Sequence, residues 1–258
     1  MSEVAGFYDA WAVDYDAAYA DWADSVRTQG RLLAAALADR GVTPGARVLD
    51  CTCGIGTQAI GIALAGYDVL GSDISPAEVE RARAEAARFG VPAEFVAADL
   101  LDLGGTLPET WSGFDAVITA NSLTHMAEER TLVRAFVQMA ATCRSGGIVA
   151  VTNRDYDTVG QPVATAVQRS TSAGVERVER VSFQLWDWSA DGRSYRMADM
   201  LLTRPEAPID GQWTVRSRST TLHAWRRADI ERAAAAAGLV DPQWHETPWQ
   251  PIATWATG

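Results

Sequence analysis

The chain has 258 residues, a hydrophobic content of 48% and a formal net charge of −11. This length and composition suffice for one large α/β domain and argue against disorder as the main state. All 22 basic residues are arginine, because the sequence contains no lysine. The absence of lysine excludes a Schiff base with pyridoxal phosphate and the lysine of a phosphate-binding P-loop. The acidic balance also disfavours a nucleic-acid partner, because phosphate contacts need a concentrated basic face.

The sequence shows no sign of export, membrane insertion or metal binding. Its first residues lack a basic region followed by an apolar stretch, and no apolar run approaches the ~20 residues that span a bilayer. We therefore expect a cytoplasmic protein without a membrane partner. Cys51, Cys53 and Cys143 form no C-x-x-C motif and have no Cys/His cluster nearby. We expect neither a disulfide framework nor a metal site.

Residues 7–26 alternate aromatic side chains with aspartates. The spacing of Trp11, Tyr15, Tyr19 and Trp22 is typical of a helical stripe, so we predict one or two helices up to about Asp39. The aspartates lie mostly on the outer side of this stripe. We expect them to form a solvated face.

The following segments alternate between strand and helix. Strands are predicted at 47–51, 67–73, 93–99, 114–121 and 146–153, and helices at 57–65, 76–90 and 128–143. This alternation predicts a parallel sheet with helices on both faces. After Arg154 the β-rich segments are 177–188, 194–204 and 212–223, and the turn at 189–192 predicts a hairpin between the first two. A helix at 226–239 and strands at 240–246 and 251–257 complete the chain.

We therefore expect an α/β, Rossmann-like fold with one inserted antiparallel β layer after the fifth strand. Its expected parts are a helical cap (1–44), a ligand-binding core (45–155), a β lid (156–225), and a C-terminal helix and strands that complete the sheet (226–258).

Polar residues stand at the predicted carboxyl ends of five successive strands: Asp50, Asp73, Asp99, Asn121 and Arg154. Ligands bind at this edge of an open α/β sheet, so the five residues describe one crevice. A local role as a helix cap or Asx turn is about as plausible for any single one of them. That role is much less plausible for all five.

Gly54 and Gly56 form a tight turn between the first strand and its helix, which brings backbone N–H groups close to a ligand. Alone, this loop also fits a dinucleotide site. The spacing of Asp73 suits ribose hydroxyls, and Asp99 could accept the amine of an adenine. Asp50 would repel a phosphate and attract an ammonium or sulfonium group. Together these residues favour a nucleoside ligand with a positive charge.

Residues 46–155 resemble the class I S-adenosylmethionine-dependent methyltransferases in the glycine loop after Val48-Leu49-Asp50, in Asp73, and in the segment that contains Asp99. Thr52 departs from the pattern, because many members have a glycine there. A narrower resemblance links the chain to the glycine and sarcosine N-methyltransferase group. It rests on segments 121–126, 153–157, 186–188 and 244–252 and on the N-terminal Tyr15, Asp21-Trp22 and Gln29.

The resemblance implies S-adenosyl-L-methionine as the cofactor. The residues expected to contact it are Tyr15, Trp22, Arg27 (or Arg31 in its place), Asp50, Gly54, Gly56, Asp73, Ile74, Asp99, Leu100, Asn121 and His125. For His125, packing against the following helix is an equal alternative.

The resemblance also implies that Asn121 and Arg154 hold the carboxylate of an amino-acid-like substrate, which an arginine fork suits. Arg154 could instead form an ion pair with Asp155 or Asp157. Tyr156 joins Asn121 and Arg154 as a candidate catalytic residue, with a place in the core as the alternative. Further candidate substrate-binding residues are Asp155, Trp186 and His245, the last with a structural role as its alternative.

Of the ten tryptophans, only Trp111 lies between residues 45 and 150. The others precede or follow the predicted core. We expect some of them, Trp22 and Trp186 included, to wall a chamber that excludes water from the methyl group, with core packing as the alternative.

These expectations add up to a methyltransferase that N-methylates a small-molecule amine with a carboxylate, as in natural product biosynthesis. Alternatives are a methyltransferase fold that uses S-adenosyl-L-methionine for cyclisation or elimination, and a non-catalytic partner subunit. A homo-oligomer and a heteromeric partner are both compatible with the sequence.

Overall fold

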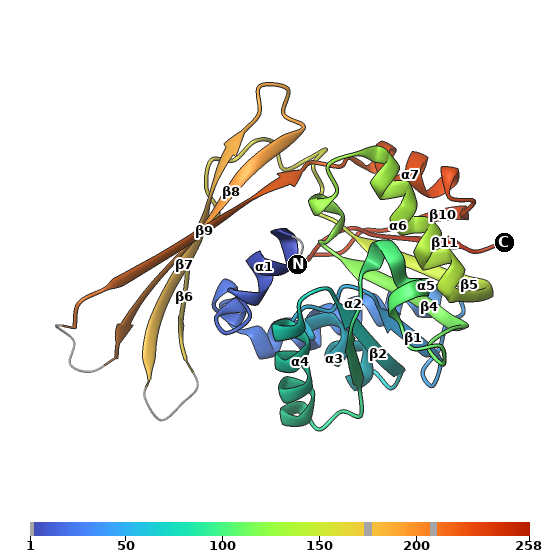
Figure 1. Cartoon of the computed structure of the whole chain (residues 1–258), viewed down its shortest axis with the longest axis horizontal. Coiled ribbons are helices and arrows are strands. Elements are labelled where there is room, and N and C mark those ends of the chain that lie inside the picture. The colour runs from blue at the N-terminus through green and yellow to red at the C-terminus, as the bar shows by residue number, and fades with distance from the viewer. Residues whose placement is uncertain (1–2, 173–176, 207–210) are drawn as a thin grey trace.

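The computed structural model describes residues 3–172, 177–206 and 211–258, which form two separate sheets (Figure 1). The larger sheet has seven strands in the order β10-β11-β5-β4-β1-β2-β3. Its parallel strands are β1 (Arg47–Asp50), β2 (Asp68–Asp73), β3 (Glu94–Ala97), β4 (Phe114–Ala120) and β5 (Cys143–Thr152). β11 (Ile252–Ala256) runs antiparallel to β5, and β10 (Val240–His245) runs antiparallel to β11.

Helices cover both faces of this sheet, and each face has its own buried core. On one face lie α2 (Trp22–Asp39), α3 (Thr57–Leu64) and α4 (Pro76–Phe89). On the other lie α5 (Leu103–Thr106), α6 (Glu129–Thr142) and α7 (Arg227–Ala236), with the short 3-10 helices η2 (Leu100–Asp102) and η3 (Leu123–His125). The expected α/β Rossmann-like fold with an inserted antiparallel layer is confirmed.

A glycine in the middle of α3 lets two helices cross closely. A Cβ atom on Gly61 would lie 2.3 Å from the carbonyl oxygen of Val26 in α2, and one on Gly30 would lie 2.2 Å from the backbone of Gly61. Glycine weakens a helix interior by about 1 kcal/mol relative to alanine. Here the close packing of α2 on α3 requires it.

The second sheet is antiparallel, with the strand order β6-β7-β8-β9. Its strands are β6 (Gln168–Thr171), β7 (Val178–Trp188), β8 (Ser194–Pro205) and β9 (Thr214–His223). β7 and β8 form the predicted hairpin. The edge strand β6 was not predicted, because its four polar, largely exposed residues carry no hydrophobic alternation. Residues 173–176 and 207–210 of the expected lid lie outside the described residues.

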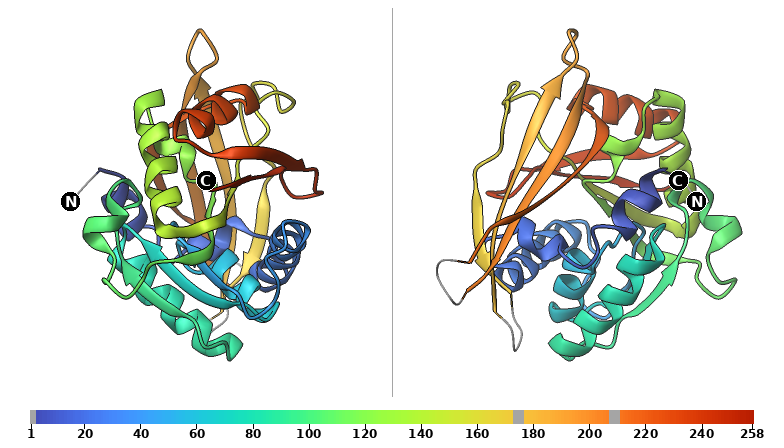
Figure 2. Two further views of the ribbon diagram at one scale, coloured as in Figure 1. Left: turned by 90° about the vertical axis from the view of Figure 1, so that its right-hand side faces the viewer. Right: turned by 60° about the vertical axis from the view of Figure 1, so that its left-hand side comes forward.

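The N-terminal segment lies between the two sheets, as Figures 1 and 2 show. It contains α1 (Glu3–Asp9), a turn and the 3-10 helix η1 (Tyr15–Ala18). The predicted helix up to Asp39 is confirmed by α2, but the helical stripe is wrong, because Trp11 lies in the turn, Tyr15 lies in η1 and Trp22 begins α2. The aromatic rings still meet across the turn: the ring centroids of Trp11 and Tyr15 are 4.8 Å apart.

Asp21 and Asp24 are exposed as expected, but Asp14 and Asp16 face the antiparallel sheet instead of solvent. Arg216 of β9 donates to Asp14 at 2.5 Å, and Arg180 of β7 donates to Asp16 at 2.7 Å. The sequence alone could not show these pairs, because the arginines are about 160 to 200 residues away.

Within the described chain, no helix is long and apolar enough to cross a membrane.

Candidate active site

A cavity of about 280 Å³ opens at the carboxyl ends of β1 to β4, where the strand order reverses. Most of the residues expected to contact a cofactor line it: Tyr15, Gly54, Asp73, Ile74, Asp99, Leu100, Asn121 and His125. We call this space the first cavity. The parallel sheet therefore brings together side chains that are up to about 110 residues apart in the sequence.

The loop after β1 needs its two glycines. Gly54 and Gly56 have φ angles of +51° and +93°, a region that side chains disfavour, and a Cβ atom on Gly56 would lie 2.9 Å from Cδ1 of Ile60. The backbone N–H of Gly54 donates to Asp73 Oδ2 at 2.9 Å. This bond ties the glycine loop to the end of β2.

Thr52 occupies the position at which many class I methyltransferases have a glycine. Its hydroxyl is hydrogen-bonded to the hydroxyl of Thr119 in β4 at 2.7 Å. The side chain therefore links the loop after β1 to the neighbouring strand. The departure from the glycine pattern leaves the turn intact.

The strand-end aspartates make local turn bonds and also stand at the ligand-binding edge. Asp73 accepts a bond from the Ser75 backbone at 3.0 Å, and Asp99 accepts one from the Leu101 backbone at 2.8 Å. Both side chains line the first cavity. Because a carboxylate can accept about four hydrogen bonds, the local role leaves capacity for a ligand.

Unpaired acidic groups give this region a negative character. The carboxyl of Asp50 is fully buried, and its Oδ2 atom has no hydrogen-bond partner among the described residues. Burial raises the pKa of Asp50 to about 7. Glu78 of α4, which lines the cavity, likewise has an unpartnered Oε1, and burial and then Asp73 raise its pKa well above the usual value. A cationic nucleoside would favour the ionised form of these groups, whereas a pyrophosphate would be repelled.

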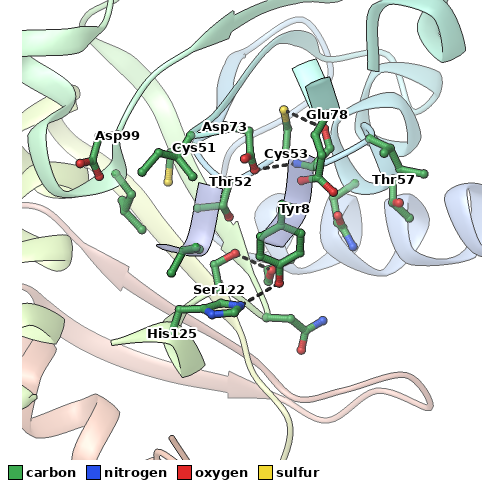
Figure 3. Close-up of a pocket in the computed structure, with 18 of the residues that line it drawn as sticks. Tyr8, Cys51, Thr52, Cys53, Thr57, Asp73, Glu78, Asp99, Ser122 and His125 are labelled. Atoms are coloured by element: carbon green, nitrogen blue, oxygen red, sulfur yellow. Dashed lines mark hydrogen bonds between the residues drawn. The ribbon is translucent and has the colours of Figure 1, made fainter. Parts of the chain in front are cut away.

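Tyr8 of α1 extends across the first cavity, between Glu78 and His125 (Figure 3). Its hydroxyl is hydrogen-bonded to Nε2 of His125 at 2.7 Å. Burial lowers the pKa of His125 to about 4, so this imidazole is neutral at pH 7. Sequence reasoning missed both Tyr8 and Glu78, because only the docking of helices α1 and α4 brings them to the cavity.

A second cavity of about 450 Å³ lies between the core, the N-terminal segment and the antiparallel sheet. It shares wall residues with the first cavity: Tyr8, Tyr15, Tyr19, Asn121 and His125. Asn121 has a φ angle of 58°, which is uncommon for a residue other than glycine and often marks functional sites. The two cavities therefore adjoin, and a ligand in one can face a ligand in the other.

Arg154 lines the second cavity, and its guanidinium carbon lies 4.1 Å from the centroid of the Trp186 ring. The alternative ion pairs do not form: Asp155 pairs with Arg227 at 2.9 Å, and the carboxylate of Asp157 is 4.0 Å from Arg226. Within the described ranges, Arg154 has no acidic partner. Its charge is available to a ligand, whereas that of Asp155 is neutralised outside the cavity.

Tyr156 also lines the second cavity, and its hydroxyl is hydrogen-bonded to that of Tyr195 at 2.8 Å. It belongs at the same time to a small buried cluster with Trp186, so Tyr156 is both a core aromatic and part of the cavity wall, and its catalytic role stays a prediction. Burial raises the pKa of both tyrosines, which keeps them neutral. Trp186, only 3% exposed, lies behind Arg154 and does not form part of the wall.

The chamber wall differs from the expected one in its aromatic residues. Tyrosines dominate it, and among the described tryptophans only Trp11 and Trp249 line the second cavity. The indole N–H of Trp22 donates to the Thr57 hydroxyl at 2.9 Å, so Trp22 lies behind the first cavity rather than in its wall.

Five other expected site residues do not line either cavity. Arg27 donates to the Ala23 carbonyl on the exposed side of α2, and Arg31 is exposed on the same helix. Asp50 is the last residue of β1, and Gly56 caps the start of α3, so both flank the glycine loop without lining a cavity. His245 lies on β10, where its ring approaches Thr254 and Asp39, so the position of this strand at the far edge of the sheet separates it from the site.

The family comparison finds a methyltransferase domain in residues 48–147. A search of curated proteins finds no match. The chain is similar to DesVI of Streptomyces venezuelae, with a TM-score of 0.71, 19% identity and 100% of both chains covered. It is also similar to CalS10 of Micromonospora echinaspora, an amino pentose methyltransferase with bound SAM (0.68, 20% identity, 96% of this chain and 97% of that chain). A third similar structure is the sugar N-methyltransferase KedS8 of Streptoalloteichus sp. ATCC 53650. Its TM-score is 0.68 and its identity 21%, and the match covers 92% of this chain and 87% of that chain.

At these identities the solved structures share the fold, and the domain match covers the strands that build the first cavity. The acidic groups and the glycine loop there fit a nucleoside with a positive charge. Residues 48–147 are a methyltransferase domain, and the chain as a whole has the class I methyltransferase fold, with S-adenosyl-L-methionine as its cofactor.

Proposed function

We propose that this enzyme methylates the nitrogen of a small-molecule amine that also carries an anionic group, in the first instance a carboxylate. The observation that carries the proposal is the second cavity, which adjoins the first and contains the unpaired cation of Arg154. Its volume of about 450 Å³ suits a small molecule. Two structural neighbours described as an amino pentose methyltransferase and a sugar N-methyltransferase support an amine acceptor, and they add amino sugars to the candidate substrates.

The first cavity would hold the cofactor through groups already in place. Asp73 would accept bonds from the ribose, Asp99 would accept one from the adenine amine, and the loop at Gly54 would approach the ligand with its backbone. When bound, S-adenosyl-L-methionine supplies an electrophilic methyl group on a sulfonium. Tyr15, Asn121 and His125 would stand where the two ligands meet, because these residues line both cavities.

The protein contributes alignment, exclusion of water and electrostatics, since an in-line displacement needs no covalent nucleophile from the chain. Cys51 and Cys53 fit this view, because burial raises the pKa of both thiols well above the usual value. They remain protonated and are poor nucleophiles. The tyrosine hydroxyls at the shared wall are neutral for the same reason.

Arg154 would position the acceptor by its anionic group. Stacking on Trp186 fixes the plane of the guanidinium and leaves N–H groups along its edge for a carboxylate. This arrangement binds a carboxylate with two parallel bonds. The amine at the other end of the substrate would then reach the wall that the two cavities share.

The test is turnover with S-adenosyl-L-methionine that carries a labelled methyl group. The acceptor panel should contain glycine, sarcosine, glucosamine and glucosamine 6-phosphate, each with the analogue that has a hydroxyl in place of the amine. We expect labelled N-methyl product and S-adenosylhomocysteine in equal amounts. Labelling of the hydroxyl analogues alone, or turnover without S-adenosylhomocysteine, would refute N-methylation.

The role of Arg154 is tested by Arg154→Ala. Loss of two charge-assisted bonds should raise the KM for acceptors with a carboxylate or phosphate by about tenfold or more, with little change for acceptors without one. The control is Arg196→Ala, because Arg196 lies on the exposed face of β8, where its guanidinium donates to the hydroxyl of Ser219. An unchanged KM in Arg154→Ala would show that the anionic group binds elsewhere.

A further inference from the structure

The inward-facing row of β8 carries one charged side chain. Alternate residues of β8 face inward and are buried: Tyr195, Met197, Asp199 and Leu201. Asp199 is only 3% exposed. The other members of this row are apolar or aromatic, and burying a carboxylate among them costs free energy unless a partner compensates.

No such partner is present. Within residues 3–172, 177–206 and 211–258, the side chain of Asp199 forms no hydrogen bond and no ion pair. Arg218, directly opposite on β9, lies 3.9 Å from the carboxylate of Asp14 instead. Gln184, directly opposite on β7, accepts a bond from the Trp186 indole at 3.2 Å. Burial accordingly raises the pKa of Asp199 to about 6.

Asp199 lines the second cavity, so the missing partner can be a ligand. Its place relative to Arg154 follows from the strand register. Trp186, on which Arg154 stacks, lies directly opposite Met197, and Asp199 is the next inward residue along β8. Both Arg154 and Asp199 line this cavity of about 450 Å³. The cavity therefore presents a cation and a carboxylate to one small molecule.

We propose that Asp199 binds the positively charged amine of the substrate, so that the enzyme selects small molecules with an anionic group for Arg154 and an ammonium group for Asp199. The ammonium gives up one proton to the Asp199 carboxylate before its nitrogen attacks the methyl group and S-adenosylhomocysteine leaves. This inference rests on the proposed function and narrows its substrate class to zwitterions. It assigns Asp199 a role in specificity. The competing structural role is neutralisation of Arg218, which lies opposite Asp199 on β9 and 3.9 Å from Asp14, and the test below separates this role from substrate binding.

The test uses Asp199→Asn, which keeps the shape and removes the charge, and the best amine acceptor of the panel. Its N-acetylated form, which has no positive charge, serves as a competitive inhibitor. We expect the KM for the amine to rise by about tenfold or more, while inhibition by the N-acetylated form and the Kd for S-adenosyl-L-methionine stay unchanged. The control is Asp187→Asn, because Asp187 is exposed on the neighbouring strand β7.

A pH series gives a second readout. Protonation of Asp199 below pH about 6 removes its charge, so the wild-type KM should rise as the pH falls, and this rise should be absent in Asp199→Asn. Arg218 from β9 and Asp14 from the turn before η1 face this group and act on its pKa in opposite directions.

A KM for Asp199→Asn within about two-fold of the wild-type value would overturn the inference. So would an equal loss of affinity for the amine and for its N-acetylated form, accompanied by a lower melting temperature, because that result indicates a structural role beside Arg218. If Asp199→Asn does not fold, Asp199→Ser provides the same comparison. A wild-type enzyme that methylates no amine in the panel refutes the proposed function itself, and that result precedes any variant.

Discussion

Replacement of Asp50 by asparagine should stabilise the ligand-free enzyme at high pH. Asp50 is fully buried, and its Oδ2 atom has no partner among the described residues. Moving its pKa from 3.8 to about 7 corresponds to about 4 kcal/mol in favour of the protonated form. The folded state thus binds this proton more tightly than the unfolded state, so the contribution of Asp50 to stability is lost as the pH rises from about 4 through about 7.

Asparagine removes this charge but introduces an amide N–H₂ that lacks an acceptor, which costs about 1–3 kcal/mol. The net gain in the free energy of unfolding should therefore be about 1–3 kcal/mol at pH 8. At pH 4, where the wild-type carboxyl is protonated, the gain should vanish or change sign. Urea denaturation without cofactor at pH 4, 6 and 8 measures it, with the exposed Asp187→Asn as the control. If the difference in the free energy of unfolding between the two proteins does not depend on pH, Asp50 does not carry an uncompensated charge at high pH.

The remaining predictions concern the two cavities. Gly56→Ala should lower the free energy of unfolding by about 1–3 kcal/mol, because the φ angle of +93° and the contact with the next helix resist a Cβ atom; Gly104→Ala, with open space around it, is the control for urea denaturation. Tyr8→Phe removes the hydroxyl that bonds the histidine of η3 and should weaken cofactor binding by about 0.5–1.5 kcal/mol in calorimetry. Trp186→Leu removes the surface under Arg154 and should raise the KM for anionic acceptors several-fold, whereas Trp186→Phe should retain most of the affinity.

The central sheet was predictable because each of its elements carries a local signal. Strands β4 and β5 contain buried apolar runs at 116–118 and 148–151. Helix α4 begins after a serine cap with a proline in its first turn, and Gly90 caps its end. The N-terminal stripe was misleading, because a spacing of three and four residues also arises when rings meet across a turn. The spacing of these residues predicts that their side chains come together, but it does not determine the backbone conformation that brings them together.

Candidate site residues could be predicted where strand ends determine them. Asp73, Asp99 and Asn121 line the first cavity because parallel strands end at one edge. Tyr8 and Glu78 carried no such signal, since their positions depend on how helices dock. For Asp199 a signal existed: an acidic residue at an inward position of an alternating strand breaks the period of two, and function is one reason for such a break.

With no lysine in the chain, arginines form the ion pairs at the place where the N-terminal segment, the antiparallel sheet and the core meet. Asp16 accepts bonds from Arg180 of β7 and from Arg81 of α4, at 2.7 and 3.4 Å, so this one carboxylate joins the N-terminal segment, the antiparallel sheet and the core. A guanidinium suits this junction, because it can bond a carboxylate while the rest of its plane is covered by neighbouring groups. Arg180 is only 8% exposed, and the loss of its partner would leave a buried charge. The acidic N-terminus therefore fixes the antiparallel sheet beside the cofactor site, and with it the distance between the two cavities.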